Sequence, residues 1–182
     1  HMVDLVRWLF GDVESVVGGV VETLIPERPD QGGKLQPVHC DDFASFVVRM
    51  ANGAIGSFLF STMAVRPSLN PSFEPAYMRL EAFGERGSLV LDLDDRLYGA
   101  RPGQAEWTEF TQPEPILEDE TIRKRVWDLS FVRLARAVTD AIRGEGDLGP
   151  AATFCDGLAV TRVLDDALHL YRKQRSTGGA RA

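Results

Sequence analysis

The chain has 182 residues, of which 44% are apolar and 26% charged, values close to those of ordinary globular domains. Its 27 acidic and 20 basic residues give a net charge of -7, which opposes a general affinity for nucleic acid or anionic lipid. These figures predict one compact domain, large enough to form a core without a structural metal or disulfide.

The cysteine and histidine content argues against metal-dependent and disulfide-stabilised classes of protein. Two cysteines, Cys40 and Cys155, lie far apart with no CxxC spacing, and the chain has three histidines. No apolar stretch reaches the roughly 20 residues that a membrane-spanning helix needs, and no charged leader precedes one. The sequence therefore predicts a cytoplasmic protein with no membrane contact.

One short segment superficially resembles a metal site, because it places His39, Cys40, Asp41 and Asp42 side by side. Adjacent residues of an extended strand point to alternate faces and cannot converge on one ion. The segment also lacks the ligand spacing of structural zinc sites. We therefore expect no metal here.

The first element in chain order is a helix, since residues 2–10 place apolar side chains at helical spacing before Gly11. A domain seldom opens inside a helix, which indicates that sequence once preceded it. The β-branched run over residues 13–25 predicts a strand. Three prolines and two glycines over residues 26–37 then predict a loop.

Two apolar runs, residues 43–50 and 55–63, are separated by a turn that contains Asn52 and Gly53. Both turn residues tolerate positive φ, so a β-hairpin is expected. The proline-rich loop over residues 65–75 is too long to be a simple connector. Loops of this length often line binding sites.

The next part of the chain predicts a second antiparallel hairpin. Residues 77–83 and 88–93 alternate in polarity and turn at residues 84–87, and short strands follow near residues 96–100 and 107–110. About six strands are therefore expected, most of them paired with their neighbours in sequence.

The last third of the chain changes to helical periodicity. One helix is expected over residues 126–142, stopped by Gly144, and a second from Pro150 to about Arg175, followed by a flexible tail over residues 176–182. Strands that come first and helices that come later predict the α+β class: an open, mostly antiparallel sheet with helices packed on one face. No strand is followed by GxGxxG, so this chain alone should not bind a dinucleotide in the usual way.

Several segments, taken in their order and spacing, resemble one family. They read HMVDLVRWLFG (residues 1–11), DDFASFVVRMANGAIG (41–56), LEAFGERGSL (80–89) and FCDGL (154–158). Together they resemble the glucose-fructose oxidoreductase, inositol dehydrogenase and MocA family, and the resemblance extends from residue 1 to about residue 172.

This resemblance implies a dihydrodipicolinate reductase-like C-terminal domain over residues 1–175, which binds substrate and forms oligomers. The nucleotide-binding half would lie outside this chain, so NAD or NADP is expected for the full-length protein and no cofactor for this chain alone. The implied reaction removes hydride from a hydroxyl of a sugar, polyol or cyclitol. A homo-oligomer, a dimer or tetramer formed through the sheet face, is also implied.

His1 is the candidate catalytic residue. His1 and Asp4 are three residues apart on the predicted helix, so they share one face and can act on one ligand. In the resembled family, a histidine at the position of His1 lies beside the substrate hydroxyl that loses its proton, a role that suits an imidazole. The family's partner aspartate and lysine lie outside this chain, and His-Met at a chain start is also what tag removal leaves.

Three further side chains are candidate substrate-binding residues. Asp4 could bind substrate or stabilise the helix N-terminus through the helix dipole. Arg66 begins the long loop and could reach a hydroxylated or anionic substrate, or remain solvated. Tyr77 could contact a sugar ring or pack in a core or interface.

Two other functional classes stay open. The chain could be a stand-alone, non-catalytic binding or assembly module. It could also be a cofactor-free isomerase or dehydratase. His1 and Asp4 are the only residues that support the acid-base role this class needs.

Overall fold

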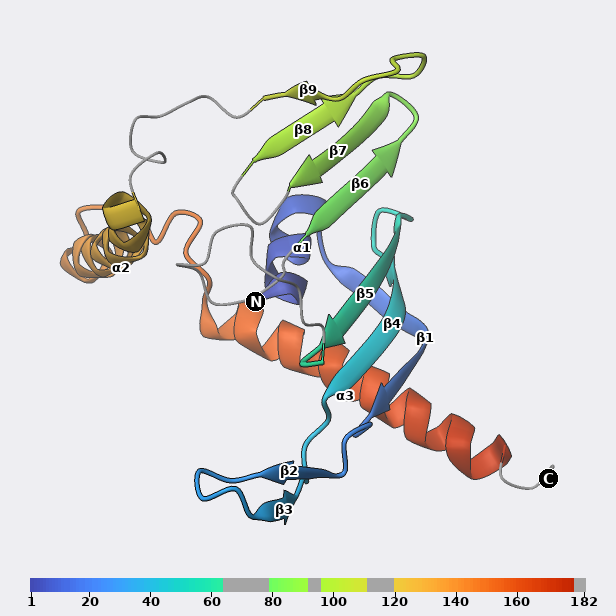
Figure 1. Cartoon of the computed structure of the whole chain (residues 1–182). Coiled ribbons are helices and arrows are strands. Elements are labelled where there is room, and N and C mark those ends of the chain that lie inside the picture. Colours follow the sequence, from blue (N-terminus) through green and yellow to red (C-terminus); the bar gives the residue numbers. More distant parts are fainter. Residues whose placement is uncertain (64–78, 92–95, 111–119, 179–182) are drawn as a thin grey trace. The chain divides into compact units, whose positions relative to one another are not determined.

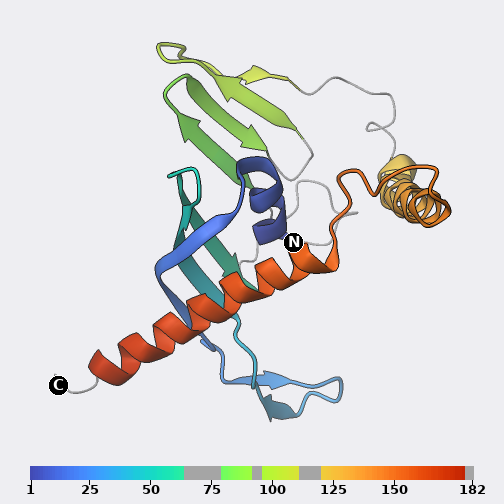
Figure 2. The same cartoon turned by 180° about the vertical axis from the view of Figure 1, so that it is seen from behind.

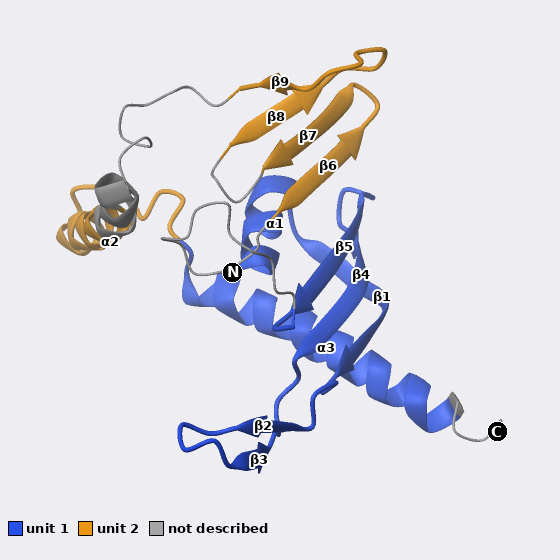
Figure 3. Ribbon diagram, viewed as in Figure 1, with its two compact units in different colours: residues 1–65, 152–182 blue, residues 66–151 orange. Residues whose placement is uncertain are grey.

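The computed structural model describes residues 1–63, 79–91, 96–110 and 120–178, without the side chains of residues 120–129 and 178. The chain divides into two compact units, coloured separately in Figure 3. Unit 1 comprises residues 1–65 and 152–182, and unit 2 comprises residues 66–151. The predicted loop over residues 65–75 lies outside the described residues.

The centre of unit 1 is a three-stranded antiparallel sheet with the order β1-β4-β5. Its strands are β1 (Val13–Glu22), β4 (Phe43–Met50) and β5 (Ile55–Ser61). The predicted Asn-Gly hairpin joins β4 to β5: Gly53 has a φ of 87° and the Ala54 N–H donates to Asn52 Oδ1 at 3.0 Å. Asn52 Nδ2 also donates to the Phe10 carbonyl at 2.9 Å, so this turn caps the end of the first helix.

Two helices, α1 (Met2–Phe10) and α3 (Phe154–Gly178), supply the core residues that pack on one face of this sheet. Figures 1 and 2, which view the chain from opposite sides, show that α3 crosses the strands. The core contains one residue of α1, four strand residues and two of α3, namely Val3, Phe46, Val48, Met50, Phe58, Val163 and Ala167. Helices on one face of an antiparallel sheet confirm the predicted α+β class.

Strand β1 can approach β4 closely because Gly19 has no side chain. A Cβ at Gly19 would lie 2.5 Å from the Phe46 Cβ and 2.6 Å from the Ser45 carbonyl oxygen, too near for either to remain in place. Register shifts after Val13 and Val16 mark bulges in the same strand. The strand was expected to reach Ile25 but ends at Glu22.

Residues 26–37, expected as a loop, contain a short hairpin of β2 (Glu27–Pro29) and β3 (Leu35–Pro37). The Asp30 carboxylate organises its turn by accepting the N–H groups of Gly32 at 2.9 Å and Lys34 at 3.0 Å. The side-chain amide of Gln36 is the main reason that the pKa of Asp30 lies below its ordinary value. Proline content alone indicated a loop because these polar contacts are invisible to composition.

A buried carboxylate, that of Asp42, attaches this hairpin to the sheet. It accepts hydrogen bonds from Leu24 N–H at 2.7 Å, Ile25 N–H at 3.0 Å and one N–H of the Arg28 guanidinium at 3.1 Å. The Leu24 bond is the largest influence that holds the pKa of Asp42 below its ordinary value, against the opposite effect of burial. The chain therefore leaves β1 at the point where Asp42 accepts the N–H groups of Leu24 and Ile25.

Unit 2 contains a four-stranded antiparallel sheet in sequence order. Its strands are β6 (Leu80–Gly84), β7 (Gly87–Leu91), β8 (Leu97–Ala100) and β9 (Thr108–Glu109). The first two form the predicted hairpin, with Gly84 opposite Gly87. The described strands thus belong to three separate antiparallel sheets rather than one.

Both later helices differ from the sequence prediction at their ends. Helix α2 (Glu120–Arg143) begins six residues before the apolar pattern suggested, and α3 begins at Phe154 rather than Pro150. The start of α3 is explained by Thr153, whose N–H and hydroxyl both donate to the Asp156 carboxylate, at 2.8 and 2.7 Å. Helix α3 continues through Gly178, into the segment expected to be a flexible tail.

We predict that Asp42→Asn lowers stability at neutral pH and flattens its acid dependence. Because the folded pKa of Asp42 is depressed, its contribution is present above the ordinary value of 3.8 and is lost as pH falls through the folded pKa. Urea denaturation from neutral to acid pH measures both effects. Asp41→Asn removes a neighbouring, exposed carboxylate as the control. Identical pH dependence in the Asp42 variant and the unsubstituted chain would contradict the assignment.

Candidate functional site

Helix α1 carries the two candidate residues nearest the chain start. His1 occupies the N-cap position, where its backbone carbonyl accepts the Leu5 N–H at 2.9 Å and its side chain makes no capping bond. Its side chain is exposed, so the imidazole is accessible to a ligand. Asp4 lies in the first turn, where its negative charge suits the helix dipole.

Asp4 points toward a cation of its own helix. Its Oδ1 lies 3.8 Å from Arg7 Nη1, an i,i+3 ion pair in which the Asp4 side chain is 39% exposed. In the described part of the chain, no hydrogen bond joins His1 to Asp4. A shared face of His1 and Asp4 therefore stays a prediction, and Asp4 has an ionic partner within its own helix.

Arg7 is the centre of an ionic network within unit 1. Its Nη2 donates to Asp12 Oδ1 at 2.7 Å, at the start of β1, and its Nη1 donates to the Asp156 carbonyl at 3.3 Å. The Asp156 carboxylate lies 3.6 Å from the same Nη1. Since the Arg7 side chain is only 11% exposed, these charges interact with reduced screening by water. The network joins α1 to the first turn of α3 and to the sheet.

Asp156 belongs both to this network and to the cap of α3. The Thr153 side-chain hydrogen bond is the largest influence that lowers the pKa of Asp156, and the Arg7 charge lowers it further. The carboxylate is therefore ionised at neutral pH. A negative charge here stabilises the helix N-terminus and holds Arg7 in place.

A second polar cluster lies in unit 1 where β1 ends against α3. The Tyr171 hydroxyl donates to Glu22 Oε1, and Arg175 Nη1 lies 3.4 Å from the same oxygen. The Glu22 bond is the main cause that raises the pKa of Tyr171, so its hydroxyl stays protonated and keeps donating. This cluster fixes the C-terminal half of α3 on the sheet.

The described residues contain no strand–turn–helix motif of the usual dinucleotide-binding kind. All their paired strands are antiparallel, and none leads through a glycine-rich turn into a helix, the arrangement that holds a pyrophosphate. The same residues contain no group of three metal-ligating side chains and no helix long and apolar enough to cross a membrane. The chemistry available here is binding by charged and polar groups and proton exchange at an exposed imidazole.

Two of the predicted site residues, Arg66 and Tyr77, lie outside the described residues. The structure places His1 at the N-cap of α1 and Asp4 in its first turn, and the roles of all four residues stay predictions.

Comparison with known proteins gives a consistent family. Residues 1–90 match the model described as the GFO/IDH/MocA C-terminal domain. Levoglucosan dehydrogenase of Pseudarthrobacter phenanthrenivorans is 33% identical over 109 residues, which cover 53% of this chain and 26% of that protein. The solved apo form of levoglucosan dehydrogenase aligns with 96% of this chain and 48% of its own, at 27% identity and a TM-score of 0.71. The chain belongs to the GFO/IDH/MocA family.

Other solved structures are similar to this chain to the same degree. An oxidoreductase domain protein from Kribbella flavida aligns with 96% of this chain and 46% of its own, at 26% identity and a TM-score of 0.70. Levoglucosan dehydrogenase has also been solved in complex with NADH and levoglucosan. The chain thus spans about half the length of these relatives, and the matched model is that of the family's C-terminal domain.

The sequence analysis did not predict the ionic network that Arg7 forms between α1, α3 and the sheet. The pairing of Arg7 with Asp156 joins residues 149 positions apart, which no local pattern reveals. The Thr153-x-x-Asp156 spacing, by contrast, is a local capping signal that could have located the start of α3.

We predict that Arg7→Met destabilises the chain by about 1–2 kcal/mol, because it leaves hydrogen-bond acceptors without their charged donor while keeping the apolar stem. Urea denaturation at neutral pH measures the loss. Arg49→Met, on an exposed residue of β4, is the matched control and should change stability by less than about 0.5 kcal/mol. Equal losses in the two variants would show that the network is energetically unimportant.

Proposed function

We propose that this chain is the substrate-binding and oligomerisation domain of an NAD(P)-dependent oxidoreductase that acts on a hydroxyl of a sugar, polyol or cyclitol. The observation that carries the proposal is the similarity to levoglucosan dehydrogenase over 96% of this chain. The match to the family model over residues 1–90 supports it, because this range includes the helix that carries His1 and Asp4.

In this proposal, His1 accepts the proton of the substrate hydroxyl as that hydroxyl is oxidised. An imidazole titrates near neutral pH, and its exposed position at the start of α1 leaves it free to meet a ligand. Asp4 orients the substrate from the same helix face, and Arg7 holds that helix against α3. Arg66 and Tyr77 contribute further substrate contacts. NAD or NADP binds a nucleotide-binding half that is not part of this chain.

Exposed apolar side chains on the helices of unit 1 support a further half that covers them. Trp8 is 65% exposed on α1, and Phe154 is 99% exposed in the first turn of α3. The proposed nucleotide-binding half would cover these side chains, as protein contacts cover exposed apolar patches. The two free and exposed cysteines, Cys40 and Cys155, fit the reducing cytoplasm that we propose as its location.

The face of the unit 1 sheet opposite the core supports the proposed homo-oligomer. Register pairs Ser45 with Val20 and Leu59, and residues paired across strands share a face, here the one away from Phe46. Leu59 is 69% exposed and Val20 is 40% exposed. A second copy of this face would remove both side chains from water.

The catalytic part of the proposal predicts that the full-length protein reduces NAD or NADP with levoglucosan, glucose or myo-inositol, measured by absorbance at 340 nm. His1→Ala should lower kcat by at least about 100-fold, the usual contribution of a general base. His39→Ala, an exposed histidine of the β3–β4 connection, is the control and should keep full activity. This chain by itself should neither bind NADH nor turn over substrate.

Two results would overturn this part of the proposal. A full-length protein that lacks dehydrogenase activity on all three substrates would favour a non-catalytic binding or assembly module. Turnover by this chain alone would favour a cofactor-free enzyme.

The proposed oligomer predicts that this chain sediments as a dimer or tetramer in analytical ultracentrifugation. Leu59→Arg should shift it to monomer, because the oligomer would have to bury an unpaired charge in its interface. Leu35→Arg changes a leucine of similar exposure on β3 and should leave the assembly intact. A wild-type monomer, or dissociation by both variants alike, would contradict the sheet-face assignment.

A further inference from the structure

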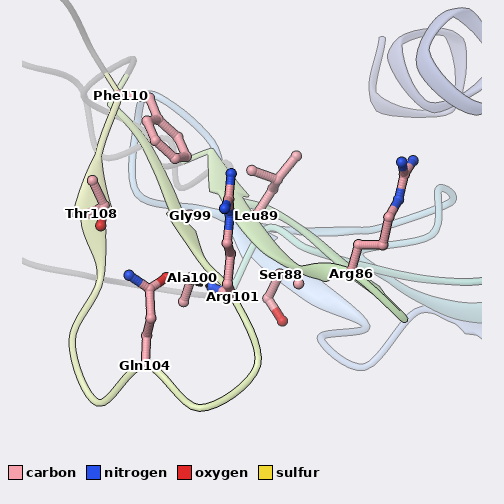
Figure 4. A pocket seen from close by; sticks show the side chains of 10 residues that line it. Arg86, Ser88, Leu89, Gly99, Ala100, Arg101, Gln104, Thr108 and Phe110 are labelled. Atoms are coloured by element: carbon pink, nitrogen blue, oxygen red, sulfur yellow. Dashed lines mark hydrogen bonds between the residues drawn. The ribbon is translucent and has the colours of Figure 1, made fainter.

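Unit 2 contains a hollow of about 500 Å³ on one face of its four-stranded sheet (Figure 4). Its lining comes from the β6–β7 turn, from β7 and β8, from the β8–β9 connection and from β9. The volume lies within the range of small-molecule sites. His1 and Asp4, the described candidate residues of the proposed dehydrogenase reaction, belong to unit 1 and do not line it.

The apolar part of the lining depends on Gly99. A Cβ at this position would lie 2.3 Å from Phe110 Cε2 and 3.1 Å from Leu89 Cδ2. The missing side chain therefore lets the Phe110 ring lie over β8 close to Leu89, as Figure 4 shows. Both side chains are about half exposed, 53% for Phe110 and 45% for Leu89, so they present an apolar surface to a ligand.

The polar part of the lining consists of hydrogen-bond donors. Arg86 and Arg101 extend on the same side of the sheet as Leu89, with Leu89 between them in the view of Figure 4. Gln104 uses its Oε1 to accept the Arg101 backbone N–H at 2.6 Å, which leaves its amide hydrogens available. The Thr108 hydroxyl also lines the hollow.

Among the described residues, no carboxylate of the lining balances these donors. None of the ten lining residues is aspartate or glutamate, and neither Arg86 nor Arg101 forms an ion pair with any carboxylate among the described residues. Glu109 on β9 lies 3.9 Å from a different arginine, Arg96. Two uncompensated guanidinium groups produce a locally positive field in a chain whose net charge is -7.

We propose that this hollow binds a small organic carboxylate that has an apolar ring. The guanidinium groups of Arg86 and Arg101 bind carboxylate oxygens, for which their paired N–H donors are geometrically suited. The ring lies against Leu89 and Phe110. The Gln104 amide and Thr108 hydroxyl bind remaining oxygen atoms, so the site prefers an anion with both polar and aromatic parts.

Titration of the ¹⁵N-labelled chain with isophthalate, followed by amide chemical shifts, tests the proposal. Saturable shifts are expected at residues 86–89, 99–101, 103–104 and 108–110, with a Kd near the millimolar level typical of small weak ligands. Arg86→Gln and Arg101→Gln should each weaken binding by about 3- to 10-fold, as expected for loss of a charged hydrogen bond at an exposed site. Arg49→Gln removes the same charge from unit 1 and should change Kd by less than about 2-fold.

Two further ligands separate the contributions of charge and ring. The neutral isostere isophthalamide should bind at least about 10-fold more weakly than isophthalate, because it has no charge for the guanidinium groups. Inorganic phosphate should also bind more weakly, since it has no ring. Phe110→Leu should weaken isophthalate binding but leave phosphate binding unchanged, because it alters only the aromatic contact.

Several outcomes would overturn the proposal. These are equal binding of isophthalamide, no saturation below about 20 mM isophthalate, and an equal loss of affinity in the Arg49 control. Amide spectra of each variant establish that it remains folded, so weakened binding by a variant reports on the site. None of these measurements depends on dehydrogenase activity, so this inference and the proposed function can fail separately.

Discussion

The ionic contacts of Arg7 hold together the parts of unit 1 on which the candidate site depends. Helix α1 has nine residues, too few for a helix to be stable by itself in water. Its position is set by Val3 in the core and by Arg7, which reaches Asp12 at the start of β1 and Asp156 at the start of α3. The helix that has His1 at its N-cap is therefore held in place by Arg7, six positions after His1, which contacts two other parts of unit 1.

The lowered carboxyl pKa values of Asp30, Asp42 and Asp156 have one physical origin. Each carboxylate accepts hydrogen bonds, the largest influence being the Gln36 side chain for Asp30, the Leu24 N–H for Asp42 and the Thr153 hydroxyl for Asp156. Each also accepts at least one backbone N–H group, in the β2–β3 turn, at the end of β1 and at the N-terminus of α3. Hydrogen bonds to the ionised form stabilise it, which lowers the pKa. Part of the acidic excess of this chain thus serves its local structure, so net charge alone says little about what the surface binds.

Local signals predicted the elements that local chemistry determines. Helical spacing ended by Gly11 gave α1, and Asn52-Gly53 gave the β4–β5 hairpin, because a period or a turn depends on neighbouring residues. The β2–β3 hairpin was missed because its attachment depends on Asp42, a residue beyond the hairpin itself. For the site, spacing predicted that His1 and Asp4 share a helix face. The Arg7–Asp156 contact joins distant parts of the chain, so it could not be predicted.

Three arginines show how the fold, rather than composition, decides what a charge does. Arg7 lies among carboxylates from α1, β1 and α3, and its side chain is 11% exposed, so its charge is used in holding these elements together. Arg86 and Arg101 lie at turn positions in unit 2, where the described lining residues include no carboxylate. The chain has more acidic than basic residues, so unpaired guanidinium groups do not result from a shortage of acids. They result from the positions of the two arginines next to the ends of β7 and β8, which bring both to one hollow whose described lining has no acidic side chain. A positive field can therefore exist on one sheet of an acidic protein.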